Sequence, residues 1–136
     1  YNGCHFWSNF EIVDLSFYRS SAYQQYFDHL DRAGGFFYER WGDAPVHSTA
    51  AALFLNASQI HYFDDIGYFH PSVLSCPRGA RTRGSCVCDE TKSFVQNGKC
   101  TVLYKQARQA ILSPDSPEPA HKGPVNHVQA GLQGML

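Results

Sequence analysis

Two acidic side chains are the first candidates for chemistry in this sequence. Glu11 ends a run in which polar residues are mixed with Phe6, Trp7 and Phe10. A carboxylate among aromatic side chains either finds hydrogen-bond donors or has its pKa raised, and both situations are common at functional sites. The other interpretation is that Glu11 belongs to a solvated helix start together with Asp14. The pattern alone leaves both interpretations open.

Asp43 is the second candidate, because it stands between an aromatic run and a helix start. The run Phe36–Tyr38 predicts a short buried strand, which ends at Gly42 and Asp43. Pro45 predicts the first turn of a helix, where its missing N–H needs no partner. An acid at such a junction lies near backbone donors and the positive helix end. The simpler interpretation is that Asp43 or Ala44 only caps the helix.

Histidine and acidic residues also raise the question of a metal. His70 follows Asp64 and Asp65, and two carboxylates with an imidazole could hold a hard divalent cation. A solvated turn with Gly67 at its tip accounts for the same residues. By contrast, His47 falls in the first turn of the expected helix, where the helix dipole favours a neutral imidazole.

The elements that must position these residues follow from apolar periodicity. Residues 14–32 form the clearest expected helix, and Gly34 ends it. Its stripe of tyrosines is interpreted as core rather than as a platform for stacking sugars. The helix from Pro45 carries a wall of alanines that permits close packing against a sheet. Residues 59–63 alternate like a strand.

Composition limits the class of protein. The chain has 136 residues, 43% hydrophobic and 15% aromatic, which fits one small domain with a real core. A net charge of −1 argues against nucleic acid as the main partner. No apolar run approaches the roughly 20 residues that span a bilayer. The chain lacks an initiator Met and a signal-like segment, so we expect a partial chain.

Five cysteines predict covalent cross-links in the second half of the sequence. Four of them fall within residues 76–100, a segment otherwise poor in apolar residues, and the fifth is Cys4. We expect a disulfide-stapled loop and an oxidising compartment, with at most one thiol left free. Zinc is the rival, but a Cys-X-Cys pair lacks the usual spacer. Asn56-Ala57-Ser58 is a glycosylation acceptor pattern, which fits a lumenal chain.

Longer strings of the sequence resemble one family. They are similar to the fungal Golgi α-1,2-mannosyltransferases, type II membrane enzymes that extend mannan chains on glycoproteins. The resemblance covers residues 1–104, firmly to residue 71 and more loosely through the cysteine segment. The matching strings are residues 1–12, 26–31, 33–36, 38–48, 59–61 and 64–71.

The resemblance implies a fold and an activity. The fold class is α/β, the C-terminal portion of a GT-A glycosyltransferase fold with a cysteine-stapled loop (residues 76–100) and a flexible tail. The activity is transfer of mannose from GDP-mannose to the 2-hydroxyl of a mannoside acceptor on a glycoprotein, with Mn²⁺ as cofactor and retention of configuration. The location is the Golgi lumen, with a membrane anchor only in an N-terminal part that this chain lacks.

The resemblance also assigns residues. Glu11 matches the carboxylate proposed as nucleophile, Asp43 lies next to the acceptor site, and His70 matches the Mn²⁺ ligand beside the nucleotide phosphates. The family's other metal-binding acid belongs to an upstream half that is missing here, so we expect the isolated chain to be inactive. Substrate contacts are expected from His5, Trp7, Ser8, Asn9 and Trp41.

Two other classes compete with this interpretation. One is a non-catalytic, disulfide-stapled carbohydrate-binding module that uses Trp7 and Trp41 against sugar rings. The other is a zinc hydrolase, which no His-X-X-X-His or His-Glu-X-X-His spacing supports. Its ligands would be His5, His47, His61 and His70.

The end of the chain departs from the family. Residues 105–136 show no resemblance, and proline and glycine are dense from residue 113 onwards. We therefore expect residues 105–136 to be a divergent, largely flexible tail, of which residues 113–136 can be removed without loss of the domain.

Overall fold

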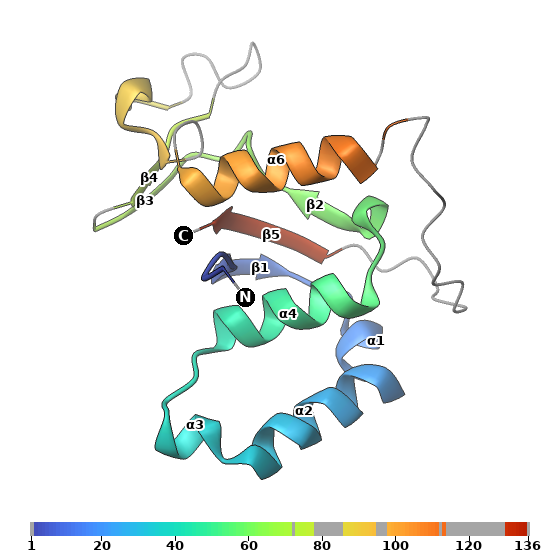
Figure 1. The fold of residues 1–136 in the computed structure, drawn as a ribbon. Coiled ribbons are helices and arrows are strands. Elements are labelled where there is room, and N and C mark those ends of the chain that lie inside the picture. Colours follow the sequence, from blue (N-terminus) through green and yellow to red (C-terminus); the bar gives the residue numbers. More distant parts are fainter. Residues whose placement is uncertain are drawn as a thin grey trace.

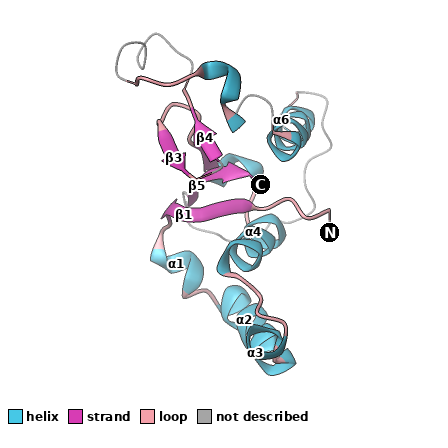
Figure 2. Cartoon of the chain, turned by 90° about the vertical axis from the view of Figure 1, so that its left-hand side faces the viewer, coloured by secondary structure: helices cyan, strands magenta, loops and turns pink. Residues whose placement is uncertain are grey.

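A three-stranded sheet organises the computed structural model, which describes residues 2–71, 73–77, 86–94, 98–111, 113 and 130–135. The strand order is β1–β5–β2, with β5 antiparallel to β1 and parallel to β2 (Figure 1). Helices α4 (Asp43–Phe54) and α6 (Lys99–Ile111) lie on the same side of this sheet, as the rotated view shows (Figure 2). The sheet strands are β1 (Phe6–Ile12), β2 (Ile60–Tyr62) and β5 (Ala130–Met135).

The other elements in the described part of the chain are helices, two 3-10 turns and one hairpin. They are α1 (Leu15–Tyr18), α2 (Ser21–Ala33), α3 (Gly35–Tyr38), α4 (Asp43–Phe54), α6 (Lys99–Ile111), the 3-10 turns η1 (Ala57–Gln59) and η2 (Glu90–Lys92), and the hairpin of β3 (Tyr68–His70) and β4 (Val73–Ser75). No described helix is long and apolar enough to cross a membrane.

The helix expected over residues 14–32 is two helices. Asp14 caps α1 by accepting a hydrogen bond from the Ser16 amide at 2.8 Å, and Ser20 caps α2 by accepting one from the Tyr23 amide at 3.2 Å. The cap at Asp14 begins the first helix, and the cap at Ser20 begins the second, so the expected helix is divided before residue 21. Gly34 ends α2 with φ of 75°, as predicted, because a glycine adopts this left-handed conformation without strain.

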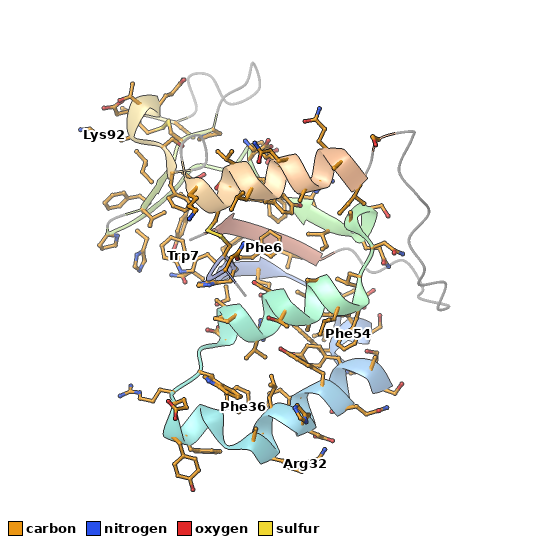
Figure 3. All side chains as sticks on the ribbon, in the orientation of Figure 1. Phe6, Trp7, Arg32, Phe36, Phe54 and Lys92 are labelled. Atoms are coloured by element: carbon orange, nitrogen blue, oxygen red, sulfur yellow. A yellow bond between two sulfur atoms is a disulfide. The ribbon has the colours of Figure 1, made fainter. Side chains whose placement is uncertain are left out.

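The strand expected at Phe36–Tyr38 is wrong. These residues form the short helix α3, and Phe37 and Tyr38 are 74% and 86% exposed. The ring of Phe36, which is labelled in Figure 3, stacks on that of Phe27 in α2 with the ring centroids 5.6 Å apart. It also meets the ring of Trp41 edge-on. The aromatic run thus packs where α2 and α3 meet and is not part of a sheet.

Helix α4 joins the two halves of the core. Ala51 packs with Phe6, Ile60 and Tyr62 against the sheet, whereas Ala50 packs with the aromatic side chains of α1 and α2 on the other side. The predicted packing of the alanines against a sheet is confirmed for Ala51, whereas Ala50 packs against the helices α1 and α2. The helix begins at Asp43 with Gly42 as its cap residue, so the prediction that Asp43 or Ala44 is the cap is wrong.

Two disulfides confirm the predicted cross-links. Cys4 pairs with Cys100 and joins the start of β1 to α6, while Cys76 pairs with Cys88 within the cysteine segment. Cys86 remains a free thiol. Four of the five sulfurs are therefore committed to disulfides, which rules out the alternative of a four-cysteine zinc site.

The end of the chain differs from the expected tail. Helix α6 continues past residue 104 to Ile111, and Ala130–Met135 forms the central strand of the sheet. Ala130–Met135 pairs on both sides in the sheet, whereas the expectation that residues 113–136 can be removed stays a prediction. Residues 114–129 lie outside the described residues.

Candidate functional site

The carboxylate of Glu11 lies at the centre of a small polar cluster between β1, α1 and α4. The Tyr18 hydroxyl donates a hydrogen bond to Oε1, and Nδ1 of His47 lies 3.0 Å from Oε2. The same Nδ1 lies 3.1 Å from the Tyr18 hydroxyl oxygen. The side chain of Glu11 is only 13% exposed and that of His47 27%. Both carboxylate oxygens are therefore held by partners from different elements.

This cluster favours the ionised carboxylate. Burial opposes ionisation of Glu11, but the hydrogen bonds from His47 and Tyr18 outweigh it and lower the pKa of Glu11. The hydrogen bond to Glu11 outweighs burial for His47 and raises its pKa. Burial and Glu11 together raise the pKa of Tyr18. The pKa shift of His47 therefore runs opposite to the expected effect of the helix dipole, because the carboxylate of Glu11 lies close to the imidazole.

Asp43 lies close to the same cluster, one helical turn before His47 on α4. Its Oδ2 accepts a hydrogen bond from the Ser8 hydroxyl at 2.8 Å, and this bond lowers the pKa of Asp43. The negative charge of Asp43 acts on both Glu11 and His47. Unlike Glu11, Asp43 is an exposed residue. The site therefore pairs a shielded carboxylate with an accessible one.

An irregularity in β1 brings these side chains onto one helix. The pairing with β5 shifts register between Trp7 and Glu11, so β1 holds extra residues at that point. A regular strand would place Ser8 and Glu11 on opposite faces, since they are three residues apart. The bulge instead lets both reach α4, as bulges beside functional sites often do.

Trp7 and Asn9 extend from β1 toward the β3–β4 hairpin. The ring of Trp7 lies 4.9 Å from that of His70 and 5.9 Å from that of Tyr68, both edge-on. Asn9 donates a hydrogen bond to the Tyr68 hydroxyl at 3.4 Å. The structure thus brings Trp7, Asn9 and His70 together around Tyr68 and the hairpin, and none of these contacts joins His70 to Glu11.

His70 is oriented as a single metal ligand would be. Its Nδ1 lies 3.1 Å from the carbonyl oxygen of Pro71, so a proton on Nδ1 leaves Nε2 with a free lone pair. Within the described part of the chain, however, no three His, Cys, Asp or Glu side chains gather closely enough to hold a metal ion. The cluster of Asp64, Asp65 and His70 is therefore not formed, nor is the four-histidine zinc site. His70 fits Mn²⁺ only as one ligand among others from outside the described residues.

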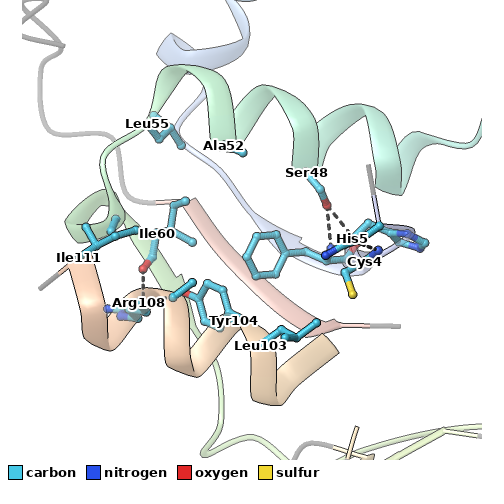
Figure 4. A pocket seen from close by; sticks show the side chains of 14 residues that line it. Cys4, His5, Ser48, Ala52, Leu55, Ile60, Leu103, Tyr104, Arg108 and Ile111 are labelled. Atoms are coloured by element: carbon cyan, nitrogen blue, oxygen red, sulfur yellow. Dashed lines mark hydrogen bonds between the residues drawn. The ribbon is translucent and has the colours of Figure 1, made fainter. Parts of the chain in front are cut away.

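Two of the expected substrate residues have other surroundings. The indole of Trp41 packs directly on Gly35, where a Cβ would lie 2.3 Å from the ring, although 42% of Trp41 remains exposed. His5 lines a cavity between α4 and α6 and lies 3.1 Å from the Gly3 carbonyl oxygen (Figure 4). His5 therefore belongs to a different part of the molecule from Glu11.

Sequence reasoning missed Tyr18 and His47 as members of the site. Tyr18 belongs to the apolar stripe expected over residues 14–32, and that pattern gives no sign of a role for its hydroxyl. His47 stands four residues after Asp43, a spacing that places both on one helix face. That spacing is the signal that could have linked His47 to the acidic candidates.

The chain is similar in structure to solved mannosyltransferases. The chain is similar to the mannosyltransferase Ktr4p of S. cerevisiae, with 45% identity and a TM-score of 0.65 over 78% of this chain and 29% of that one. It is also similar to core-mannan synthase A of Aspergillus fumigatus in its Mn/GDP form, with 48% identity and a TM-score of 0.54 over 68% and 28% of the two chains.

Sequence comparison then gives the family. The profile of the family described as glycolipid 2-alpha-mannosyltransferase matches residues 1–109, and the chain belongs to this family. Glycolipid 2-alpha-mannosyltransferase 1 of Candida albicans is 60% identical over 107 residues, which cover 76% of this chain and 25% of that protein. Alpha-1,2 mannosyltransferase KTR1 of Saccharomyces cerevisiae is 58% identical, with shares of 76% and 27%. The chain spans about a quarter of the length of these relatives.

Proposed function

We propose that this chain forms the C-terminal part of the catalytic domain of a retaining α-1,2-mannosyltransferase. The reaction moves mannose from GDP-mannose to the 2-hydroxyl of a mannoside acceptor on a glycoprotein. The observation that carries this proposal is the Glu11 carboxylate, which Tyr18 and His47 keep ionised although it is mostly buried. The relatives named as mannosyltransferases support the reaction class.

In this proposal Glu11 acts on the mannose of the donor. Departure of the diphosphate leaves positive charge on the anomeric carbon, which a fixed carboxylate stabilises. Retention is compatible with two routes. In a double displacement Glu11 attacks the anomeric carbon, and in a front-face reaction it steadies the cationic sugar. In both routes the carboxylate must be unprotonated and fixed in place, which is what its two partners achieve.

In this proposal Asp43 binds the acceptor. It is exposed, ionised and oriented by Ser8, and it lies close enough to Glu11 for their charges to interact. An exposed carboxylate next to a buried one can hold the hydroxyl groups of a second sugar. Trp7 and Asn9 then line the path between the acceptor side and His70.

Mn²⁺ belongs to the donor side of the proposal. Bound to the diphosphate, the ion would neutralise the charge of the leaving group. His70 would supply one nitrogen ligand through Nε2, oriented by the Pro71 carbonyl. The Mn/GDP form of core-mannan synthase A supports manganese as the ion. The other ligands would come from the upstream part of a GT-A fold.

The location proposed is the Golgi lumen, as part of a type II membrane protein. Two disulfides support an oxidising compartment of this kind. A free Cys86 is compatible with this compartment, because the other four cysteines of this sequence pair with each other.

A chimera tests the proposed function. Residues 1–109 would replace the matched quarter of the Candida albicans relative, and release of GDP and transfer of mannose to a mannoside would be measured. The unaltered relative is the positive control. We expect transfer that depends on both GDP-mannose and Mn²⁺. A folded chimera that binds mannosides but transfers nothing would instead support the non-catalytic carbohydrate-binding module.

A further inference from the structure

The turn between α4 and β2 carries a sequence pattern that the proposed reaction does not use. Asn56-Ala57-Ser58 has the Asn-X-Ser form of an N-glycosylation acceptor, and no other asparagine of the sequence is followed two positions later by serine or threonine. Asn56 directly precedes the 3-10 turn η1, and Ser58 lies within it. Short patterns of this kind also arise by chance, so the surroundings of Asn56 decide whether the folded chain can carry a glycan there.

Both polar residues of the pattern are accessible. Asn56 and Ser58 are exposed, whereas Ala57 between them is partly buried. The backbone N–H of Asn56 donates a hydrogen bond to Oε1 of Gln59 at 2.8 Å, and the carbonyl oxygen of Asn56 accepts one from the Gln59 amide at 2.9 Å. The main chain of Asn56 thus holds the turn. Neither of these bonds uses Nδ2, the atom to which an N-linked sugar is joined.

The residues on either side of Asn56 belong to an apolar rim. Leu55 and Ala57 both line the cavity of about 540 Å³ between α4 and α6, and Ile60 and Ile111 line the same cavity (Figure 4). Ile111 is 52% exposed, so part of this rim faces solvent. A glycan on Asn56 would start at the edge of this apolar surface. Because a glycan is bulky and strongly hydrated, it would shield the rim from contacts with other apolar surfaces.

We propose that Asn56 carries an N-linked glycan that screens this apolar rim. The inference rests on the proposed lumenal location, where the disulfides and the glycan would both be formed. The donor is an oligosaccharide joined through a diphosphate to a lipid. Nδ2 of Asn56 forms a bond to the anomeric carbon of the first N-acetylglucosamine and gives up one proton. The bond from that carbon to the diphosphate oxygen breaks, and the lipid diphosphate leaves. Oδ1 remains an amide oxygen, so the side chain stays neutral.

Secretion of the full chain from yeast, behind a cleavable leader, tests the modification. An amidase would release the glycan in heavy-oxygen water, which leaves a labelled aspartate at the asparagine that carried it, and mass spectrometry would locate the label. We expect the label at residue 56. It should be absent from Asn56→Gln and Ser58→Ala and present in Ser58→Thr, which keeps the acceptor pattern. Asn126→Gln, outside the pattern, is the matched control and should keep the label at residue 56.

Screening of the rim would be measured on the same samples with a dye that fluoresces on exposed apolar surface. We expect fluorescence to rise when the glycan is released and to reach the level of Asn56→Gln, with no rise when the amidase is added to Asn56→Gln itself. A secreted chain that has both disulfides but no label at residue 56 would overturn the modification. Dye binding that is unchanged by release of the glycan would overturn the screening. Neither result depends on mannose transfer, which the chimera measures separately.

Discussion

Nδ1 of His47 lies 3.0 Å from Oε2 of Glu11, so a side chain of α4 directly holds a side chain of β1. The two residues are 36 positions apart in the sequence. Replacing His47 by alanine removes a partner of a mostly buried carboxylate. Because hydrogen bonds to charged groups contribute about 1.5–3 kcal/mol, we expect the free energy of unfolding to fall by an amount in that range. Urea denaturation at neutral pH would measure it.

The control for this variant is His29→Ala on the exposed side of α2. It removes the same side chain at a solvent-facing position, where substitutions usually change stability by less than about 0.5 kcal/mol. Equal losses of stability in the two variants would show that His47 does not support Glu11.

The pH dependence of stability follows from the two shifted groups. The pKa of Glu11 is lowered from 4.5, so its contribution is present above that value and is lost as the pH falls through the lower, folded pKa. The pKa of His47 is raised from 6.5, so its contribution is present below 6.5 and is lost as the pH rises through the higher, folded pKa. The stabilisation by the pair should therefore be greatest between about pH 4.5 and pH 6.5.

This window is measured as the difference in unfolding free energy between the wild-type chain and His47→Gln across the pH range. Glutamine can still donate a hydrogen bond but does not titrate. A difference that stays constant from about pH 4 to pH 9 would contradict an ion pair between these residues.

Tyr18→Phe isolates the second partner of Glu11. The ring contacts with Phe17 and Tyr23 remain, at 5.5 Å and 4.7 Å, while the hydroxyl donor is lost. We expect a higher pKa for Glu11 and a loss of about 1–3 kcal/mol in stability. Carboxyl titration followed by NMR would report the pKa directly. Tyr38→Phe is the matched control, because Tyr38 is 86% exposed, and an equal effect there would refute the role of Tyr18.

The thiol content tests the disulfide assignment. Under denaturing, non-reducing conditions we expect one reactive thiol per chain, that of Cys86. The Cys86→Ser variant should have none. Three or five thiols would contradict the pairs Cys4–Cys100 and Cys76–Cys88.

Much of the fold near the site could be predicted from the sequence. The end of α2 at Gly34, the strand at residues 60–62 and the alanine face of α4 all follow from local patterns. The aromatic run at Phe36–Tyr38 was misread, because three adjacent aromatics suit a strand and a short exposed helix equally well. Its packing on Phe27 is a tertiary contact that local periodicity does not contain.

The site itself was predicted only in part. Glu11 and Asp43 could be selected as acids near aromatics and a helix start; Glu11 contacts α4, and Asp43 is the first residue of α4. The hydrogen-bond partners of these acids could not be predicted, because they depend on tertiary structure. Tyr18 contacts Glu11 from the end of α1. Ser8 contacts Asp43 from the irregular part of β1. The strand at Ala130–Met135 was also missed, since its glycines resemble a linker in sequence.

Glu11→Gln in the chimera is the most direct test of the account. The substitution keeps the shape of the side chain and removes the charge proposed to stabilise the sugar cation. We expect kcat to fall by about 10²–10³, the usual loss for one preorganised electrostatic group, with little change in the binding of GDP. Glu39→Gln, at an exposed residue after α3, is the control and should retain normal kcat. Near-normal turnover by Glu11→Gln would contradict a catalytic role for Glu11.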